Sequence, residues 1–335
     1  MIAPVCSAGS YIACITHRAV NYPALNLWFA RGDKTDRQYS QWTSTKEQWE
    51  QLMTPNLVPW LLYEPDDSGI LWIKFNRPDR MNATLGSAQD RSTASKVVEY
   101  MRHGDDDPNV RVIVLTGVGR GFCAGNDAKG PKEDEDFGEF LPGNRTPRED
   151  NPDGERQSFF NGYTKIIREI SLIRKPTIAM VNGPAAGSGM DMAVQCDIRV
   201  GCENSRFITY HARGQIIENG GAYFLPRIIG LGRTLEFAYT GQVDAQLAQQ
   251  WGLLNHLVPS EELEDFTREL CGRIMQVSPV SQWINKRIIR AALDTTLEGT
   301  MVMTSNAATI IALTEDKDEA RDAQIERRPP VFKGR

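Results

Sequence analysis

The sequence has few of the side chains from which metal sites and disulfide frameworks are built. Its six cysteines include no C-x-x-C pair, and its four histidines are scattered along 335 residues. Both kinds of site need such side chains at characteristic spacings, so we expect no metal ion, and we interpret the cysteines as small buried residues in a reducing compartment. No apolar run reaches the ~18 residues of a membrane span, so we expect no membrane span.

The chain also lacks an excess of positive charge. Its formal net charge is −5, which is unlike the balance of a general nucleic-acid binder, so we expect no nucleic-acid partner. Hydrophobic residues make up 41% of the chain and charged residues 24%, as in ordinary globular proteins. The length fits one large domain or two.

Acidic residues are missing from the start of the chain, where the first is Asp33. Basic residues are few there as well, and no amphipathic helix is evident. We predict an N-terminal extension over residues 1–56 that is poorly ordered, with an organelle transit segment as the alternative reading of residues 1–55. The expected location is cytoplasmic, or mitochondrial or another organelle if that alternative holds.

Two β-branched runs, residues 112–116 and 177–181, have the composition of buried strands. The first ends in a glycine-rich turn at 117–125, and the second in Asn182-Gly183 and the small residues 185–189. Small residues after a strand let the backbone approach a ligand, and a helix start offers unpaired N–H donors. Two such donors aimed at one oxygen form an oxyanion hole.

Further periodic segments indicate an α/β protein. We predict strands at 70–75, 197–200 and 207–208. We predict a helix at 88–101 that ends at His103-Gly104. Further predicted helices lie at 159–173, 190–194, 261–276, 281–293, 297–313 and 317–327. Residues 130–151 are polar and rich in glycine and proline, which predicts a solvated loop. Because this loop follows the first glycine-rich turn, we also expect it to cover one end of a substrate.

The segments FCAGND at 122–127 and NGPAAGSGMD at 182–191 resemble the two signature segments of the enoyl-CoA hydratase/isomerase (crotonase) family. Shorter matches occur in the same order from about residue 57 to residue 335. The resemblance implies a crotonase-like α/β spiral of strand-strand-helix repeats over residues 57–259. It further implies a helical C-terminal trimerisation region at 260–335, and therefore a homotrimer or hexamer.

The family's shared chemistry is the stabilisation of a thioester enolate, as in fatty acid metabolism. By resemblance, the donors to the carbonyl oxygen are the backbone N–H groups of Asn126 and Ser188. Many relatives have glycine where this chain has Ser188, but a backbone donor tolerates a small side chain. We do not read the Ser188 hydroxyl as a nucleophile, because no histidine stands at a recognisable partner spacing. No cofactor is expected, since coenzyme A enters as part of the acyl-CoA substrate.

Carboxylates decide the reaction within this family, and hydratases use two glutamates to activate a water. Asp191 stands at the first of these positions. The second has no acid, because residues 209–212 are Thr-Tyr-His-Ala, which leaves Tyr210 or His211 there. Glu218 falls where dienoyl-CoA isomerases carry a catalytic aspartate. We predict Glu218, Asp191 and His211 as catalytic candidates, with helix-start acids and a bonded polar histidine as the alternatives.

The resemblance also implies contacts between the chain and its acyl-CoA substrate. The predicted substrate-binding residues are Arg77, Ala83, Cys123, Ala124, Gly125, Asp127, Lys129, Gly187, Tyr210, Phe332 and Lys333. Asp127 is read first as the cap of its own turn. The predicted activity is that of an enoyl-CoA hydratase or isomerase, a lyase or an isomerase by class. A C–C bond or thioester hydrolase, and a non-catalytic acyl-CoA-binding paralogue, remain the alternatives.

Overall fold

The computed structural model describes residues 55, 57–85, 92–127, 166–209, 214, 216–217 and 220–335. All of them belong to one compact unit, Met53–Arg335. Within this described part, none of the helices is both long and apolar enough to cross a membrane.

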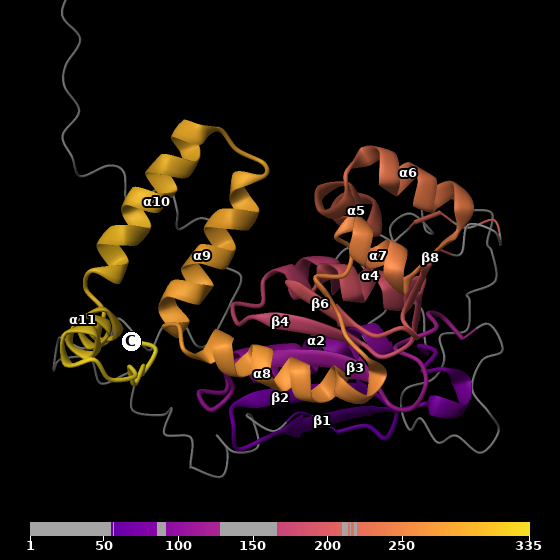
Figure 1. The fold of residues 1–335 in the computed structure, drawn as a ribbon, viewed down its shortest axis with the longest axis horizontal. Coiled ribbons are helices and arrows are strands. Elements are labelled where there is room, and N and C mark those ends of the chain that lie inside the picture. Colours follow the sequence, from indigo (N-terminus) through magenta and orange to yellow (C-terminus); the bar gives the residue numbers. More distant parts are fainter. Residues whose placement is uncertain are drawn as a thin grey trace, which may run out of the picture. The chain divides into compact units, whose positions relative to one another are not determined.

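A six-stranded sheet forms the centre of the unit (Figure 1). Its strands, in spatial order, are β1 (Leu61–Pro65), β2 (Ile70–Phe75), β3 (Val112–Gly117), β4 (Thr177–Val181), β6 (Ile198–Gly201) and β9 (His256–Leu257). β1 runs antiparallel to β2, and the other neighbours are parallel. The strands predicted at 70–75 and 177–181 are confirmed at those bounds.

Both faces of this sheet are buried, which explains why its strands read as continuous apolar runs. Along β3, Ile113 and Leu115 belong to the larger core cluster, and Val112 and Val114 to a second cluster on the other face. Alternate side chains of a strand point to opposite faces, so one run of β-branched residues supplies two cores. The helix α8 (Leu263–Met275) covers the second cluster with Leu263, Leu270 and Cys271.

A second, smaller sheet starts where strands of the first sheet turn. It contains β5 (Pro184–Ala186), β7 (Arg206–Ile208) and β8 (Gln242–Asp244). β4 leads through β5 into α4 (Ser188–Gln195), and β6 leads through β7 toward α5 (Gly221–Ile229). The strand-strand-helix units predicted from the sequence are therefore present.

The predicted end of one helix is wrong. α2 (Thr93–Asp106) continues past His103-Gly104, where we expected it to stop. A β-carbon added to Gly104 would overlap the side chain of Leu71 on β2, so the glycine allows the helix to pack closely on the sheet. The sequence reading gave no bounds for the helix α5, and it missed the helices α6 (Leu231–Thr240) and α7 (Ala245–Trp251) and the short 3₁₀ turn Ser260–Glu262. A turn is predicted at 76–79, where the structure has a 3₁₀ turn at Pro78–Arg80.

Three further helices complete the chain: α9 (Pro279–Ala292), α10 (Leu297–Ile311) and α11 (Glu315–Glu326). Figure 1 shows α9 and α10 as a pair that stands away from the sheet. Asp197, just before β6, anchors α9 through Lys286 Nζ at 2.6 Å and Arg290 Nη2 at 2.7 Å. Burial opposes the charge of Asp197, but these cations and the Thr177 amide hold its pKa below the ordinary value.

The C-terminal tail is held by Asp316, whose side chain is 2% exposed. Its carboxylate accepts hydrogen bonds from the Ser278 hydroxyl at 2.8 Å and from the amide of Lys333 at 2.7 Å. Arg111, the residue before β3, donates to the carbonyls of Met275 and Val277 on the chain leading into α9. The tail is therefore fixed near the end of the sheet where β3 begins.

Candidate active site

The two predicted donor segments follow β3 and β4, and a glycine with positive φ precedes each donor. Gly125, with φ of 77°, precedes Asn126, and Gly187, with φ of 52°, precedes Ser188. L-residues with side chains rarely adopt such backbone angles. Glycine is thus required at both positions to turn the next N–H away from its strand. Ser188 is also the first residue of α4, where backbone N–H groups have no partner within the helix.

Backbone contacts hold the two segments beside each other. Cys123 and Ala185 form an isolated parallel bridge, and the amide of Ala186 donates to the Cys123 carbonyl at 2.8 Å. A β-carbon on Gly189 would overlap this same carbonyl, so the first turn of α4 lies directly against Cys123. The Cys123 thiol is fully buried, and burial raises its pKa to about 12, which keeps it protonated and unsuited to act as a nucleophile.

Thr84 is a residue of this site that the sequence reading missed. Its amide donates to the Gly125 carbonyl at 2.8 Å, and its carbonyl accepts from the amide of Asp127 at 2.9 Å. Its hydroxyl lies 3.0 Å from Oδ1 of Asn126 and 3.4 Å from the Ser188 hydroxyl. One side chain therefore contacts both donor residues. The available signal was its position directly after Ala83, which the resemblance names as a substrate-binding residue.

Arg77 and Asp127, both predicted to contact substrate, form a buried ion pair of 3.0 Å. Their side chains are 4% and 6% exposed, and Arg77 also donates to the carbonyl of Ala83 at 2.7 Å. The pair ties the loop after β2 to the turn that carries Asn126. These contacts give Arg77 and Asp127 a supporting role, and any contact of this loop with substrate stays a prediction.

Asp191 lies in the first turn of α4, three residues after Ser188, and is 1% exposed. A β-carbon on Gly221 would overlap Oδ1 of Asp191 and crowd Ile217, so this carboxylate lies beside the start of α5. Glu218 lies between Ile217 and Gly221 in the sequence. The fold thus brings Asp191 next to the segment that contains the second candidate acid.

The remaining predicted residues lie in different parts of the chain. Phe332 and Lys333 lie in the tail held by Asp316, Ala83 is buried, and the amide of Ala124 donates to the carbonyl of Met81 at 3.0 Å. Lys129, Tyr210, His211, Glu218 and the predicted covering loop at 130–151 lie outside the described residues. Their roles stay predictions.

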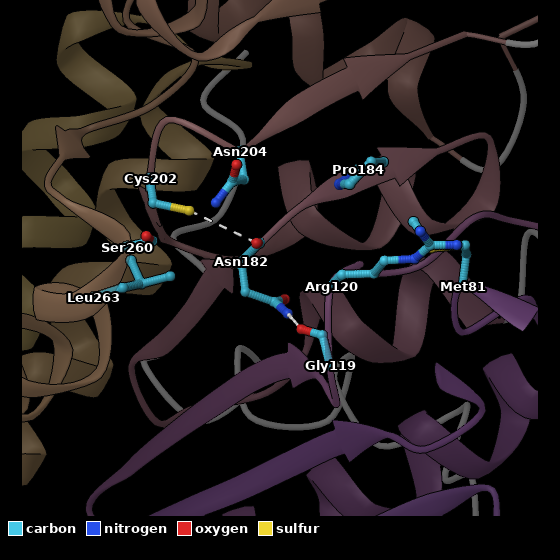
Figure 2. Close-up of a pocket in the computed structure, with 9 residues that line it drawn as sticks. All are labelled: Met81, Gly119, Arg120, Asn182, Pro184, Cys202, Asn204, Ser260 and Leu263. Carbon is cyan, nitrogen blue, oxygen red and sulfur yellow. Dashed lines mark hydrogen bonds between the residues drawn. The ribbon is translucent and has the colours of Figure 1, made fainter. Parts of the chain in front are cut away.

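A cavity of about 520 Å³ opens at the corner turns between the two sheets, lined by Met81, Gly119, Arg120, Asn182, Pro184, Cys202, Asn204, Ser260 and Leu263. Figure 2 shows Arg120 extended toward Met81 and the Asn182 amide bonded to Gly119. The Cys202 thiol in turn donates to the Asn182 carbonyl. These bonds hold the corner turns together, and none of the predicted site residues lines this cavity, so we do not assign the active site to it.

The chain as a whole is similar to proteins of one known family. The sequence model of the enoyl-CoA hydratase/isomerase family matches residues 66–335. The 1,2-epoxyphenylacetyl-CoA isomerase of Escherichia coli is 28% identical over 271 residues, which are 80% of this chain and 97% of that protein. An enoyl-CoA isomerase/hydratase of Mycosarcoma maydis is 28% identical over 293 residues, covering 84% of this chain and all of that protein.

Solved structures show the same fold. An enoyl-CoA hydratase of Bacillus anthracis superposes with a TM-score of 0.70 at 26% identity, covering 82% of this chain and 100% of the other. A subunit of an enoyl-CoA hydratase from Geobacillus kaustophilus gives a TM-score of 0.69 at 29% identity, covering 82% and 98%. These structures confirm the predicted crotonase-like α/β spiral with C-terminal helices.

Proposed function

Since the chain belongs to the enoyl-CoA hydratase/isomerase family, we propose that it transforms an enoyl-CoA thioester through an enolate bound by the N–H groups of Asn126 and Ser188. The observation that supports this most is the pair of glycine-turned segments, held together by the Cys123–Ala185 bridge. Thr84 touches the side chains of both donor residues, which supports assigning the two residues to one site.

The proposed chemistry follows from where charge develops. Removing a proton from the substrate, or adding water to it, moves negative charge onto the thioester oxygen. A fixed N–H dipole that meets this charge contributes ~3 kcal/mol to lowering the barrier. Ser188 begins α4, so the partial positive charge of the helix N-terminus adds to its donor.

Isomerisation is the reaction we favour within this family. It needs one acid to move a proton from one carbon to another, whereas hydration needs two groups that hold and activate a water. Residues 209–212 contain no acid where hydratases have their second glutamate. Both curated relatives named above include isomerase in their names. Hydration with Asp191 and Glu218 as the pair is the second candidate.

A screen of enoyl-CoA thioesters tests this function. A shift of the double bond with no uptake of water supports isomerisation, and addition of one water to the acyl group, read from the product mass, supports hydration. Release of a free CoA thiol would instead indicate a thioester hydrolase, and a shortened acyl-CoA product would indicate a C–C bond hydrolase. Tight binding of acyl-CoA without turnover would show a non-catalytic paralogue. We propose that no cofactor is needed besides the coenzyme A of the substrate.

The position of the tail bears on how the nucleotide end of CoA is bound. Asn126 and Ser188 follow the carboxyl ends of β3 and β4, whereas Asp316 holds the tail near the amino end of β3. The six residues of β3 span about 20 Å at ~3.3 Å per residue. We therefore propose that Phe332 and Lys333 reach a CoA bound by a neighbouring copy of the chain.

The helices α9 and α10 support such an assembly, since neither contains a buried residue. Large apolar side chains on and just beyond them are nevertheless exposed: Ile289, Leu293, Leu297, Met301, Val302, Ile310 and Leu313. A monomer seldom leaves so many large apolar residues of neighbouring helices in water, so we propose that copies of the chain cover one another here.

We expect light scattering at micromolar concentration to give the mass of a trimer or hexamer. Burying these apolar side chains supplies the free energy of association. Met301→Glu together with Val302→Glu should dissociate the assembly, and Tyr239→Glu, which changes an exposed residue on α6, serves as the control. A wild-type protein that scatters as a monomer would contradict the assembly.

A further inference from the structure

We propose that Thr84 is a positioning residue of the oxyanion hole, whose hydroxyl sets the spacing of the Asn126 and Ser188 donors. This inference rests on the proposed function, because it assigns a role to a residue that supports the same two N–H groups. It adds a polar contact made by side chains to a hole that otherwise depends on backbone geometry alone.

Backbone hydrogen bonds hold Thr84 in place independently of its side chain. Its N–H and C=O both bond to the Asn126 segment, through Gly125 and Asp127, and Thr84 and Asn126 form a parallel bridge. These backbone hydrogen bonds fix the position of the Thr84 side chain relative to the first donor segment. Thr84 is 3% exposed and Ser188 8% exposed, so water competes little for the contact between their hydroxyls, whereas Asn126 is an exposed residue.

The direction of the two side-chain hydrogen bonds follows from counting protons. A threonine hydroxyl has one proton to donate and two lone pairs to accept with. Thr84 donates its proton to Oδ1 of Asn126 at 3.0 Å. In the 3.4 Å contact with Ser188, the serine hydroxyl is therefore the donor. A chain of hydrogen bonds thus runs from Ser188 through Thr84 to Asn126 and spans the two donor segments.

The position of the hydrogen bonds from Ser188 through Thr84 to Asn126 explains how they would hold the two donors in place. The Cys123–Ala185 bridge links the two segments three residues before each donor, and beyond it lie Gly125 and Gly187, the most permissive residues of each turn. The Thr84 contacts come after both glycines, at the donor residues themselves. They limit the freedom that the glycines leave, which a preorganised oxyanion hole requires. They also occupy the Ser188 hydroxyl, which argues again that it is not a nucleophile.

Thr84→Val tests the proposal, because valine has nearly the shape of threonine and carries a methyl group in place of the hydroxyl. The probe is acetoacetyl-CoA, which loses an α-proton to the buffer to form an enolate with its own near-ultraviolet absorbance. We expect the wild-type protein to raise the ratio of enolate to keto form on binding. Thr84→Val should lower that ratio by about 10-fold, within the ~10²-fold that a displacement of about 1 Å can cost. Turnover of the best substrate should fall in parallel, with KM little changed.

Three variants separate positioning from general stability. Thr84→Ser restores the hydroxyl and should recover the enolate ratio. Thr267→Val removes a buried hydroxyl that bonds Leu263 within α8, away from the site, and should leave the ratio unchanged. If Thr84→Val does not fold, Ser188→Ala is the substitute. It removes the serine hydroxyl, the other end of the hydrogen-bond chain, but keeps the backbone N–H, and it should also lower the enolate ratio.

The outcomes distinguish this inference from the function on which it rests. A wild-type protein that binds acetoacetyl-CoA without raising its enolate fraction overturns the proposed oxyanion hole and the role of Thr84 with it. A wild-type protein that does so, with Thr84→Val equal to it, overturns the Thr84 proposal alone. A loss in Thr84→Val that Thr84→Ser does not recover also overturns it, because the hydroxyl would then not be the cause.

Discussion

Ser188→Pro should lower turnover of the best enoyl-CoA substrate by about 10²-fold or more, the cost of losing one oxyanion donor. Proline has no N–H, yet its fixed φ suits the first position of a helix, which Ser188 occupies in α4. The substitution therefore deletes the donor while α4 keeps its start. Single-turnover measurement of the chemical step is the readout, with circular dichroism to check the helix content.

Ser188→Ala is the matched control for this experiment. It removes the hydroxyl and its contact with Thr84 but keeps the backbone N–H. We expect it to lose no more than about 10-fold, as for Thr84→Val. Equal losses in Ser188→Ala and Ser188→Pro would mean that the N–H does not act on the substrate, and the oxyanion assignment would then be wrong.

The sequence predicts those parts of the fold whose cause lies in neighbouring residues, and it misses those whose cause is a contact between residues far apart in the chain. The runs at 70–75 and 177–181 are almost wholly apolar because both faces of the sheet are buried, so strand composition alone identified them. Gly104 misled the reading, since a glycine near a helix end usually marks a stop, and only the contact with Leu71 shows that it is a packing residue. That contact joins residues far apart in the chain, and no local pattern contains it.

The same limit applies to the site. Glycines at 125 and 187 are visible in the sequence because each permits a local turn, and the resemblance to a known family named the residues that follow them. Thr84 was missed, because its importance lies in reaching Asn126 and Ser188, 42 and 104 residues away. Arg77 shows the same limit: the resemblance named it as a contact for substrate, which stays a prediction, but no local pattern revealed its buried ion pair with Asp127, 50 residues away.

Glu218→Gln should lower turnover by at least about 10²-fold, the scale of general acid–base catalysis, because an enolate reaction needs a base near the α- or γ-carbon. Asp191 and Glu218 are the two acids that the sequence places for this role. The fold supports treating them together, since the Asp191 carboxylate lies beside Gly221, three residues after Glu218 in the sequence.

The two acids should nevertheless differ in their effects. Asp191 is 1% exposed and packed against the start of α5, so we expect Asp191→Asn to lose less turnover than Glu218→Gln. Initial rates on the best substrate, with KM measured separately, give the comparison. Hydration of crotonyl-CoA should be slow beside that reaction, because Thr209 to Ala212 supply no second carboxylate for the water. If Glu218→Gln keeps full activity, Glu218 only stabilises a helix start, and His211 with Asp191 becomes the catalytic pair to test.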